Sequence, residues 1–231
     1  MTEQLATTTS FSEVIRARRS PREFMSDPVP LEVVESVLED AQTSPSNSNT
    51  QPWSVHVVSG AARDELSVEL LAAHDEQRSS LDFTATYGEG VHLERSQHFG
   101  ATLYGALGIS RHDHQGREEF VRNNLKFFGA PHVALLFMPQ LGDGVRTAGD
   151  IGMYAQNFLL SLTAHGYQGV PQTMLGMYAD PARKVLGVPD DLKLLFGISF
   201  GAPTPDSPAR SVDPGRLPLR ESVVLHDTPL W

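Results

Sequence analysis

Residues 44–59 read SPSNSNTQPWSVHVVS, and this stretch shows where the chain changes from helix to sheet. Ser44 to Pro52 are turn-forming residues, whereas Trp53 to Ser59 alternate in polarity and are rich in β-branched side chains, which predicts a strand. Apolar residues at helical spacing flank this stretch at 31–41 and 61–74. Because helices and strands mix along the chain without a regular βα alternation, the sequence predicts an α+β fold.

The other elements follow from the same patterns. Ser10 and Glu13 have the spacing of a capping box, which predicts a short helix from Phe11 to about Arg19, ended by Pro21. A helix over 150–165 is apolar on nearly every side, so we expect it to be buried. The patterns also predict helices at 92–108 and 181–186, strands at 133–138 and 192–200, and loops at 75–91 and 112–116.

Prolines set the end of the chain apart. Residues 203, 205, 208, 214 and 218 are all proline, which forbids a regular helix after Gly201. We therefore expect one domain over residues 1–231, with a core at 10–200 and an extended C-terminal arm at 201–231.

Composition excludes several classes of function. The 231 residues carry a formal net charge of −10, which argues against binding to nucleic acid or to anionic membranes, because both need a broad positive surface. The chain has no cysteine, so disulfides, thiolate nucleophiles and iron–sulfur clusters are excluded. No stretch approaches the roughly 18 to 20 apolar residues of a membrane span, and the first twenty residues lack the apolar core of a signal peptide. We expect a cytoplasmic protein.

Basic residues gather near the start of this acidic chain. Four of its eighteen Lys and Arg residues fall between Arg16 and Arg22, in the run RARRSPR. Guanidinium groups and the Ser20 hydroxyl suit phosphate oxygens. The alternative is a helix C-terminus, which also favours cations, by about 0.3–1 kcal/mol each.

Three further segments have polar or conformational features that suit a ligand. Asn47, Asn49 and Gln51 offer amide donors and acceptors for the edge of a heteroaromatic ring, although a solvated turn would look the same. In GVPQTM, residues 169–174, the glycine permits close approach of the backbone to a ligand. Arg216 is a lone arginine in the arm.

Taken in this order, the four segments resemble the nitroreductase family of FMN enzymes. The chain is similar to the family over RRSPR at 18–22, PSNSNTQPW at 45–53, GDIGMYAQNFLLSLTAHGYQ at 149–168 and RLP at 216–218. The resemblance runs from about Phe11 to the end and points to the branch that reduces nitrobenzoates and other nitroaromatics. It implies a mixed, mainly antiparallel sheet flanked by helices, in an intertwined homodimer whose arm embraces the partner subunit.

The resemblance also implies roles for individual residues. Around the FMN phosphate and ribityl chain it places Arg18, Arg19, Ser20 and Arg216, with Arg22 near the pyrimidine edge of the flavin. The partner subunit would supply Pro45, Ser46, Asn47 and Asn49. Under the flavin ring would lie Pro171, Gln172 and Thr173, with a backbone N–H reaching the flavin nitrogen N5. Gln51, Gly169 and Val170, in the same two segments, are further candidates for binding the cofactor. The chain departs from many relatives in two places: Pro214 replaces a lysine, and Thr173-Met174 replaces Glu-Gly.

These roles imply an NAD(P)H-dependent enzyme that reduces nitroaromatic compounds by two-electron, ping-pong chemistry. Arg22 and Thr173 would support the flavin, and no side chain is assigned as a general acid or base. Candidates to line the acceptor pocket are Tyr104, Phe128 and Met174. The alternatives are a flavin reductase, a dehalogenase or a quinone-reducing enzyme of the same fold, or a protein that binds FMN without turnover. The reductant is NADPH or NADH.

Two other kinds of site fit the sequence less well. Gly197 to Gly201 match the G-x-S-x-G pattern of serine hydrolases, but the prolines at 203 and 205 cannot open the helix that this motif requires. His112 and His114 are two residues apart in an expected loop, without a third ligand at a recognisable spacing. We therefore expect neither a hydrolase nor a metal site.

Overall fold

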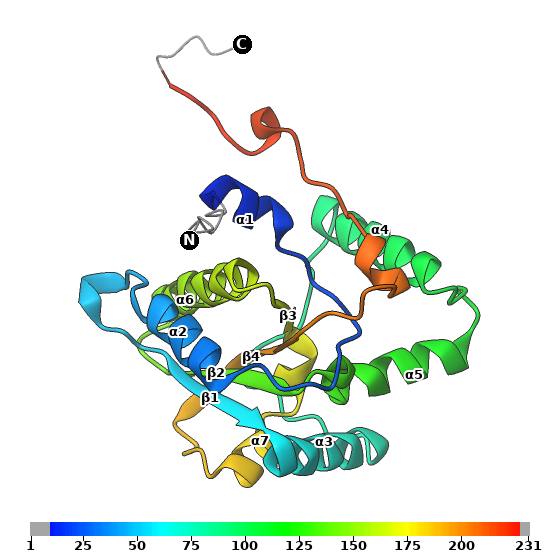
Figure 1. Ribbon diagram of the computed structural model, residues 1–231, viewed down its shortest axis with the longest axis horizontal. Helices are drawn as coiled ribbons and strands as arrows, with labels where there is room; N and C mark the ends of the chain where they lie inside the picture. Colours follow the sequence, from blue (N-terminus) through cyan, green and yellow to red (C-terminus); the bar gives the residue numbers. More distant parts are fainter. Residues whose placement is uncertain (1–9, 227–231) are drawn as a thin grey trace, which may run out of the picture.

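A computed structural model describes residues 10–226 and centres on a four-stranded sheet (Figure 1). Its strands are β1 (Ser54–Ser59), β2 (His132–Pro139), β3 (Gln168–Gln172) and β4 (Leu192–Gly201), in the order β1-β2-β4-β3. All three strand pairs are antiparallel, so none of the described strands supplies the parallel pairing that a mixed sheet would have. The α+β prediction is confirmed.

Helices cover both faces of this sheet. Because successive side chains of a strand point to opposite faces, Ala134, Leu136 and Met138 of β2 pack against α2 (Leu31–Gln42) and α6 (Val145–Ala164). The intervening residues Val133, Leu135 and Phe137 face the other core, formed with α3 (Gly60–Asp75) and α7 (Ala179–Leu186). The central strand is therefore buried on both sides, which explains its unbroken apolar sequence.

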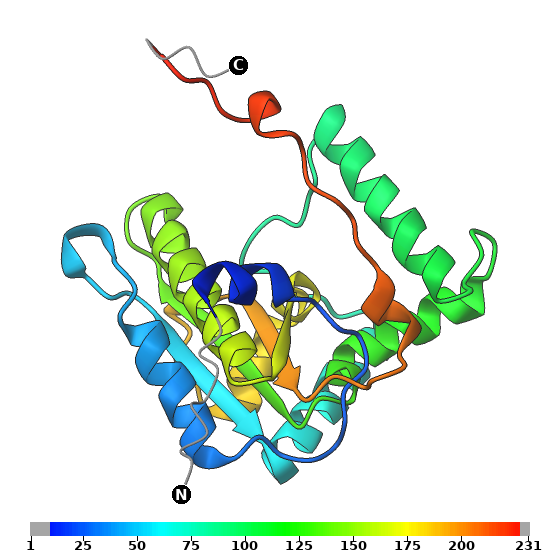
Figure 2. The ribbon, with the colours of Figure 1, turned by 45° about the horizontal axis from the view of Figure 1, so that its top comes forward.

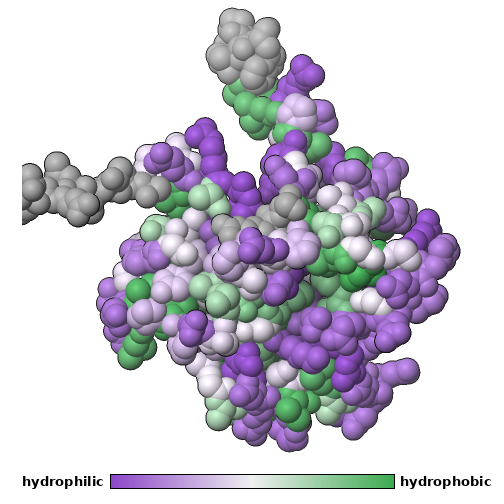
Figure 3. Space-filling view, turned by 45° about the vertical axis from the view of Figure 1, so that its right-hand side comes forward, coloured by the Kyte–Doolittle hydropathy of each residue, from purple (hydrophilic) through white to green (hydrophobic). Residues whose placement is uncertain are grey.

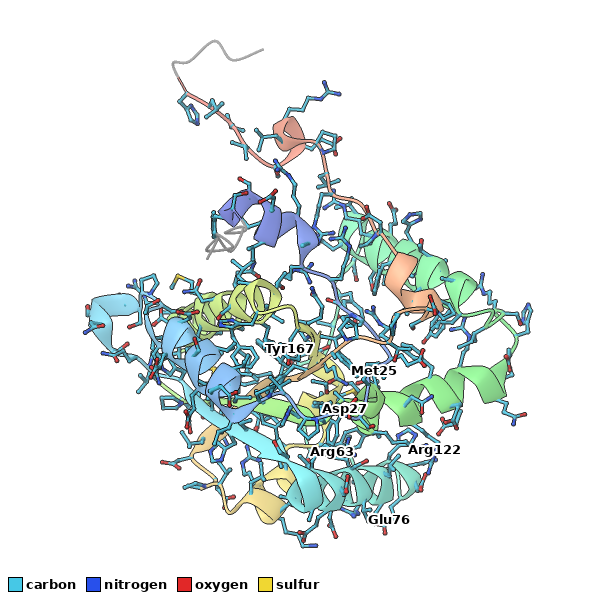
Figure 4. All side chains as sticks on the ribbon, in the orientation of Figure 1. Met25, Asp27, Arg63, Glu76, Arg122 and Tyr167 are labelled. Atoms are coloured by element: carbon cyan, nitrogen blue, oxygen red, sulfur yellow. The ribbon has the colours of Figure 1, made fainter. Side chains whose placement is uncertain are left out.

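The first helix, α1 (Phe11–Ala17), has the predicted capping box. The Ser10 hydroxyl accepts a hydrogen bond from the Glu13 N–H, and the Glu13 carboxylate accepts one from the Ser10 N–H. The helix ends at Ala17, not near Arg19 as predicted, because Arg18 is already extended at φ −58° and ψ 126°. Residues 18–30, on which Met25 and Asp27 are labelled, then lead to α2 (Figure 4).

Several predictions from the sequence were wrong in detail. The expected loop at 112–116 contains the start of helix α5 (His114–Leu125), because the Asp113 side chain accepts a hydrogen bond from the Gly116 N–H and caps it. Strand β3 was not predicted, and α6 begins at Val145, not Asp150. Helix α6 is also not buried all round, since Gln156 and other residues of one face are exposed.

The C-terminal half of the expected loop at 75–91 is free of regular structure, but its start is anchored. Ser80 forms a bridge with Tyr178, and the buried Asp82 carboxylate accepts hydrogen bonds from the Arg183 guanidinium and the Leu194 N–H. Arg122 of α5, labelled in Figure 4, pairs with Asp75 at the end of α3. The contacts of Ser80 and Asp82 fix the start of the loop to α7 and β4, and the Arg122–Asp75 pair joins α5 to α3.

Helix α4 (Val91–Ala106) and the segment after Val212 lie apart from the main body. Only Leu103 of α4 is buried, and the C-terminal segment runs past α4 and then away from the sheet (Figure 2). In the space-filling view it stands clear of the body and exposes hydrophobic side chains (Figure 3), which include Leu217, Leu219, Val224 and Leu225. As predicted, the proline-rich segment forms no α-helix within the described residues; it has short 3₁₀ turns at Pro208–Ser211 and Leu219–Glu221.

None of the helices in residues 10–226 combines the length and the apolar character needed to cross a membrane.

Candidate functional site

An open cavity of about 820 Å³ lies between α1, α4, α6 and the start of the C-terminal segment. Its size falls within the range of small-molecule and cofactor sites. Segments far apart in the sequence form its walls, namely Ile15, Arg16, Arg18, Arg19, Ser20, Arg22, Phe99, Gln156, Leu159, Pro171, Val212, Asp213, Pro214 and Arg216. The structure therefore brings together the arginines at the start of the chain, the β3 strand and the arginine of the arm.

The arginines of this cavity form no ion pair with a carboxylate in the described part of the chain. Within residues 10–226, no carboxylate lies within the 4.0 Å of an ion pair from Arg18, Arg19, Arg22 or Arg216. Burial lowers the pKa of Arg18, and the like charges of Arg216 and Arg19 lower it further. Unpaired cations held close together in an acidic protein favour an anionic ligand, since such a ligand would relieve both the repulsion and the lost hydration.

Arg18 and Arg22 are arranged around Ser20. The Arg18 Nη1 donates to the Ser20 hydroxyl at 3.2 Å, and the Arg22 Nη1 donates to the Ser20 carbonyl at 2.8 Å. The Arg22 guanidinium also lies 5.4 Å from the ring centroid of Phe99, on α4, and burial lowers its pKa. Contacts to Ser20 and Phe99 leave further N–H groups of both guanidiniums available to a ligand.

Arg19 is held differently. Its guanidinium turns back towards α1, where Nη1 donates to the carbonyls of Arg16 at 2.5 Å and Arg18 at 3.0 Å. Its main-chain N–H donates to the Gln168 side chain at 2.8 Å. Arg19 thus contributes charge to the cavity and also stabilises the end of the helix.

Strand β3 forms one wall of the cavity through Pro171. Gly169 lies before it with no room for a side chain, because an added Cβ would lie 2.9 Å from both Ile198 and Leu159. The glycine is therefore required for packing within the chain, whereas the sequence suggested close approach to a ligand. Val170 is buried against β4, and Thr173 is exposed at the start of the 3₁₀ helix η3 (Thr173–Met177).

The Gln172 side chain points into the core. It accepts a hydrogen bond from the Ser199 hydroxyl and donates to the Asn124 carbonyl at 2.8 Å and to its side chain at 2.7 Å. Ser199 is fully buried, so it cannot serve as the exposed nucleophile of a hydrolase elbow. In the described part of the chain no cluster of His, Asp or Glu could hold a metal ion.

The amide-rich loop at 44–52 does not line this cavity. The Asn47 N–H donates to both oxygens of Asp150 at 3.1 Å, near the start of α6. Gln156 and Leu159 line the cavity six and nine residues later, which is about 9 to 14 Å along the helix axis. The loop projects at the opposite side of the molecule from α4, as both ribbon views show (Figures 1 and 2). Its candidate residues, Pro45, Ser46, Asn47, Asn49 and Gln51, are therefore not joined to the arginines within one chain.

The candidates for the acceptor pocket also lie outside the cavity walls. Tyr104 packs edge-on against Phe120, and the Arg117 guanidinium lies 4.4 Å from the Tyr104 ring centroid. Phe128 is buried and Met174 is half-buried, both against the core beneath α3. Their proposed contact with an acceptor stays a prediction.

Some residues of the cavity were not predicted to be functional. Phe99 looked like a core residue of its helix, and the sequence gave no sign that Leu159 would face a ligand. One signal was present: Gln156 is a polar residue within an otherwise apolar helix face.

An α+β fold with a solvent-open cavity, unpaired arginines at one end and apolar walls at Phe99, Leu159 and Pro171 defines a protein that binds a phosphorylated or otherwise anionic organic ligand. The comparison with known proteins is more specific. The chain belongs to the nitroreductase family, whose model matches residues 15–202.

Individual relatives agree with this assignment. The chain is 50% identical over 190 residues to nitroreductase NfnB of Mycolicibacterium smegmatis, covering 81% of this chain and 80% of the relative. It is 34% identical over 228 residues to a 4-nitrobenzoate reductase of a Nocardioides species, covering 96% and 90%. The crystal structure of the FMN-dependent nitroreductase NfnB from Mycobacterium smegmatis in complex with NADPH superimposes with a TM-score of 0.90 at 45% identity, covering 93% and 97%. The predicted nitroreductase-like fold is confirmed.

Proposed function

We propose that this protein is an FMN-dependent oxidoreductase that uses NADPH to reduce nitroaromatic compounds. The observation that carries the proposal is the group of arginines that face one cavity without a carboxylate partner in the described chain. Relatives that are 50% and 34% identical are named as a nitroreductase and a nitrobenzoate reductase, and the first of them has been crystallised with NADPH.

The residues of the cavity fit FMN. Arg18, Ser20 and Arg216 offer hydrogen-bond donors suited to a phosphate, and they lie on walls of the same cavity. Arg22 is more buried and contacts Phe99, so it suits the polar edge of the ring system. Pro171 and Leu159 line the same cavity and would offer apolar surface to the ring of a bound flavin. FMN, when bound, supplies the electron-transfer chemistry, since it can accept a hydride from a nicotinamide and pass electrons to an acceptor.

The protein's own contribution is position and electrostatic field. A guanidinium whose charge is partly desolvated stabilises nearby negative charge more strongly than one in water. Arg22 would therefore favour the doubly reduced, anionic state of its ligand and disfavour a one-electron state. No described residue is assigned as a general acid or base, and the open cavity admits solvent protons.

We further propose a homodimer in which a second copy completes each site. Two observations support this assembly: loop 44–52 lies away from its own cavity, and the C-terminal segment exposes the apolar side chains of Leu219 and Val224 to solvent. Pairing would bring loop 44–52 of one chain to the cavity of the other and would cover the arm at 201–231. We also propose a cytoplasmic location, where reduced nicotinamides are made and used.

The first experiment is purification followed by a visible spectrum and measurement of the mass in solution. The expected result is a yellow dimer that NADPH bleaches without oxygen and that 4-nitrobenzoate restores to yellow. A yellow protein that neither NADPH nor NADH bleaches would instead indicate FMN binding without turnover. A monomer that does not bind added FMN would contradict the proposal as a whole.

The arginines can be tested directly. The double variant Arg18→Ala with Arg22→Ala should purify colourless and still dimeric, because it removes charge from the cavity without touching the core. Full flavin occupancy in this variant would contradict the assignment of these arginines.

A further inference from the structure

Gln168 lies at the start of β3, the edge strand of the sheet, and reaches across to the end of α1. Its side-chain oxygen accepts a hydrogen bond from the Arg19 N–H at 2.8 Å. Its side-chain nitrogen donates to the Ala17 carbonyl at 3.4 Å. One amide group therefore holds the main chain on both sides of Arg18.

The two hydrogen bonds of Gln168 support the C-terminal end of helix α1. Helix α1 has only seven residues, too few to be stable alone, and its last carbonyls have no partner within the helix. The chain leaves the helix at Arg18 in an extended conformation, so the direction of residues 18–20 depends on contacts from elsewhere in the fold. Gln168 supplies such a contact from a strand whose position the sheet determines.

Gln168 does not itself line the large cavity. It lines a smaller cavity of about 140 Å³ together with Ala17, Arg19, Ser20 and Pro21, and this cavity shares Arg19, Ser20 and Val212 with the large one. Gln168 therefore contacts the main chain of the arginine turn without forming part of the wall of the large cavity. Three residues further along the same strand, Pro171 lines the large cavity, so β3 fixes the position of the wall and of the arginine turn together.

We propose that Gln168 is a positioning residue for the phosphate-binding arginines. The inference rests on the proposed function, because it assumes that Arg18 and Ser20 receive the phosphate of FMN. Gln168 acts through the main chain at Ala17 and Arg19, and its loss should leave the residues around the flavin ring in place. Its effect should therefore be confined to the phosphate end of the ligand.

Comparison of FMN with riboflavin tests this directly, because the two differ only in the phosphate. Dissociation constants of both ligands would be measured on apoprotein of the wild type and of Gln168→Met, which keeps the side-chain length but loses both hydrogen bonds. We expect the preference for FMN over riboflavin to fall about tenfold, the effect of roughly one or two hydrogen bonds, with riboflavin affinity changed less than twofold. Gln115→Met, at an exposed position of α5, is the matched control and should leave both constants unchanged.

A second variant guards against misfolding. Gln168→Asn keeps the amide on the edge strand but is one methylene too short to reach both Ala17 and Arg19, so it should show the same loss of preference. An unchanged preference in either folded variant would overturn the inference, as would equal losses of FMN and riboflavin, which would indicate a general structural role. If the wild type itself binds riboflavin as tightly as FMN, the proposed phosphate site is wrong. This result comes from the wild type alone, so it is distinguished from a failure of the inference about Gln168.

Discussion

Replacement of Arg22 by methionine separates its role in binding from its role in folding. The side chain donates one hydrogen bond to the Ser20 carbonyl, worth about 1 kcal/mol, and contacts Phe99, worth about 0.5–1 kcal/mol. Against these losses, removal of a partly buried cation without a carboxylate partner in the described chain returns a hydration cost of the same order. We expect the terms to cancel, so that the apoprotein changes in stability by less than about 1 kcal/mol.

Binding should respond very differently. A charge-assisted hydrogen bond to the ligand contributes about 1.5–3 kcal/mol, so the dissociation constant of FMN should rise about 10- to 150-fold. Urea unfolding of the apoprotein measures the first effect, and titration of flavin fluorescence measures the second. The control is Arg78→Met, which removes an exposed arginine paired with Glu76 and should change neither. Unaltered FMN affinity, or a loss of stability above about 3 kcal/mol, would refute the reasoning for Arg22.

Three other predictions use the same measurements. Gly169→Ala should lower the free energy of unfolding by about 1–3 kcal/mol in urea, because its Cβ would overlap Ile198 and Leu159; wild-type stability would show that β3 can move away from α6. The Nε2 atom of His132 accepts a hydrogen bond from the Val29 N–H, and burial lowers the pKa of His132, so the folded state binds a proton on this imidazole less readily than the unfolded state. The free energy of unfolding should therefore fall as the pH drops from about 7 to 5.5, and a free energy that does not change with pH would contradict this. Asp150→Ala should remove both hydrogen bonds that the Asp150 carboxylate accepts from the Asn47 N–H, and so weaken FMN binding to the dimer. Unchanged FMN affinity would show that loop 44–52 does not reach the site.

The sequence predicted those elements whose hydrophobic pattern agrees with their final burial. Strands β2 and β4 and helices α2 and α3 belong to this group, because one or both of their faces form the core. Helix α5 was missed altogether because its first residues, His114 to Glu119, give no apolar stripe at helical spacing. Strand β3 was missed because a glycine and a proline interrupt a run of only five residues.

The site was predictable to a similar extent. Charge and residue type pointed to the arginines near the start of the chain, and the structure places them with Arg216 in one cavity. Neither pattern nor charge could show that Gln172 turns inward to Ser199 or that Gln168 holds the arginine turn. Those contacts join residues up to 151 positions apart, and only the packing of the whole chain decides them.

Loop 44–52 and the arginine cavity lie at different places along α6, so the loop of one chain does not line the cavity of that chain. In the proposed dimer, cofactor loading and subunit pairing are then one coupled equilibrium. Added FMN would favour the dimer by mass action, and strong dilution would cause FMN and the subunits to dissociate together. Cells short of riboflavin would accordingly hold less of this protein in its paired form.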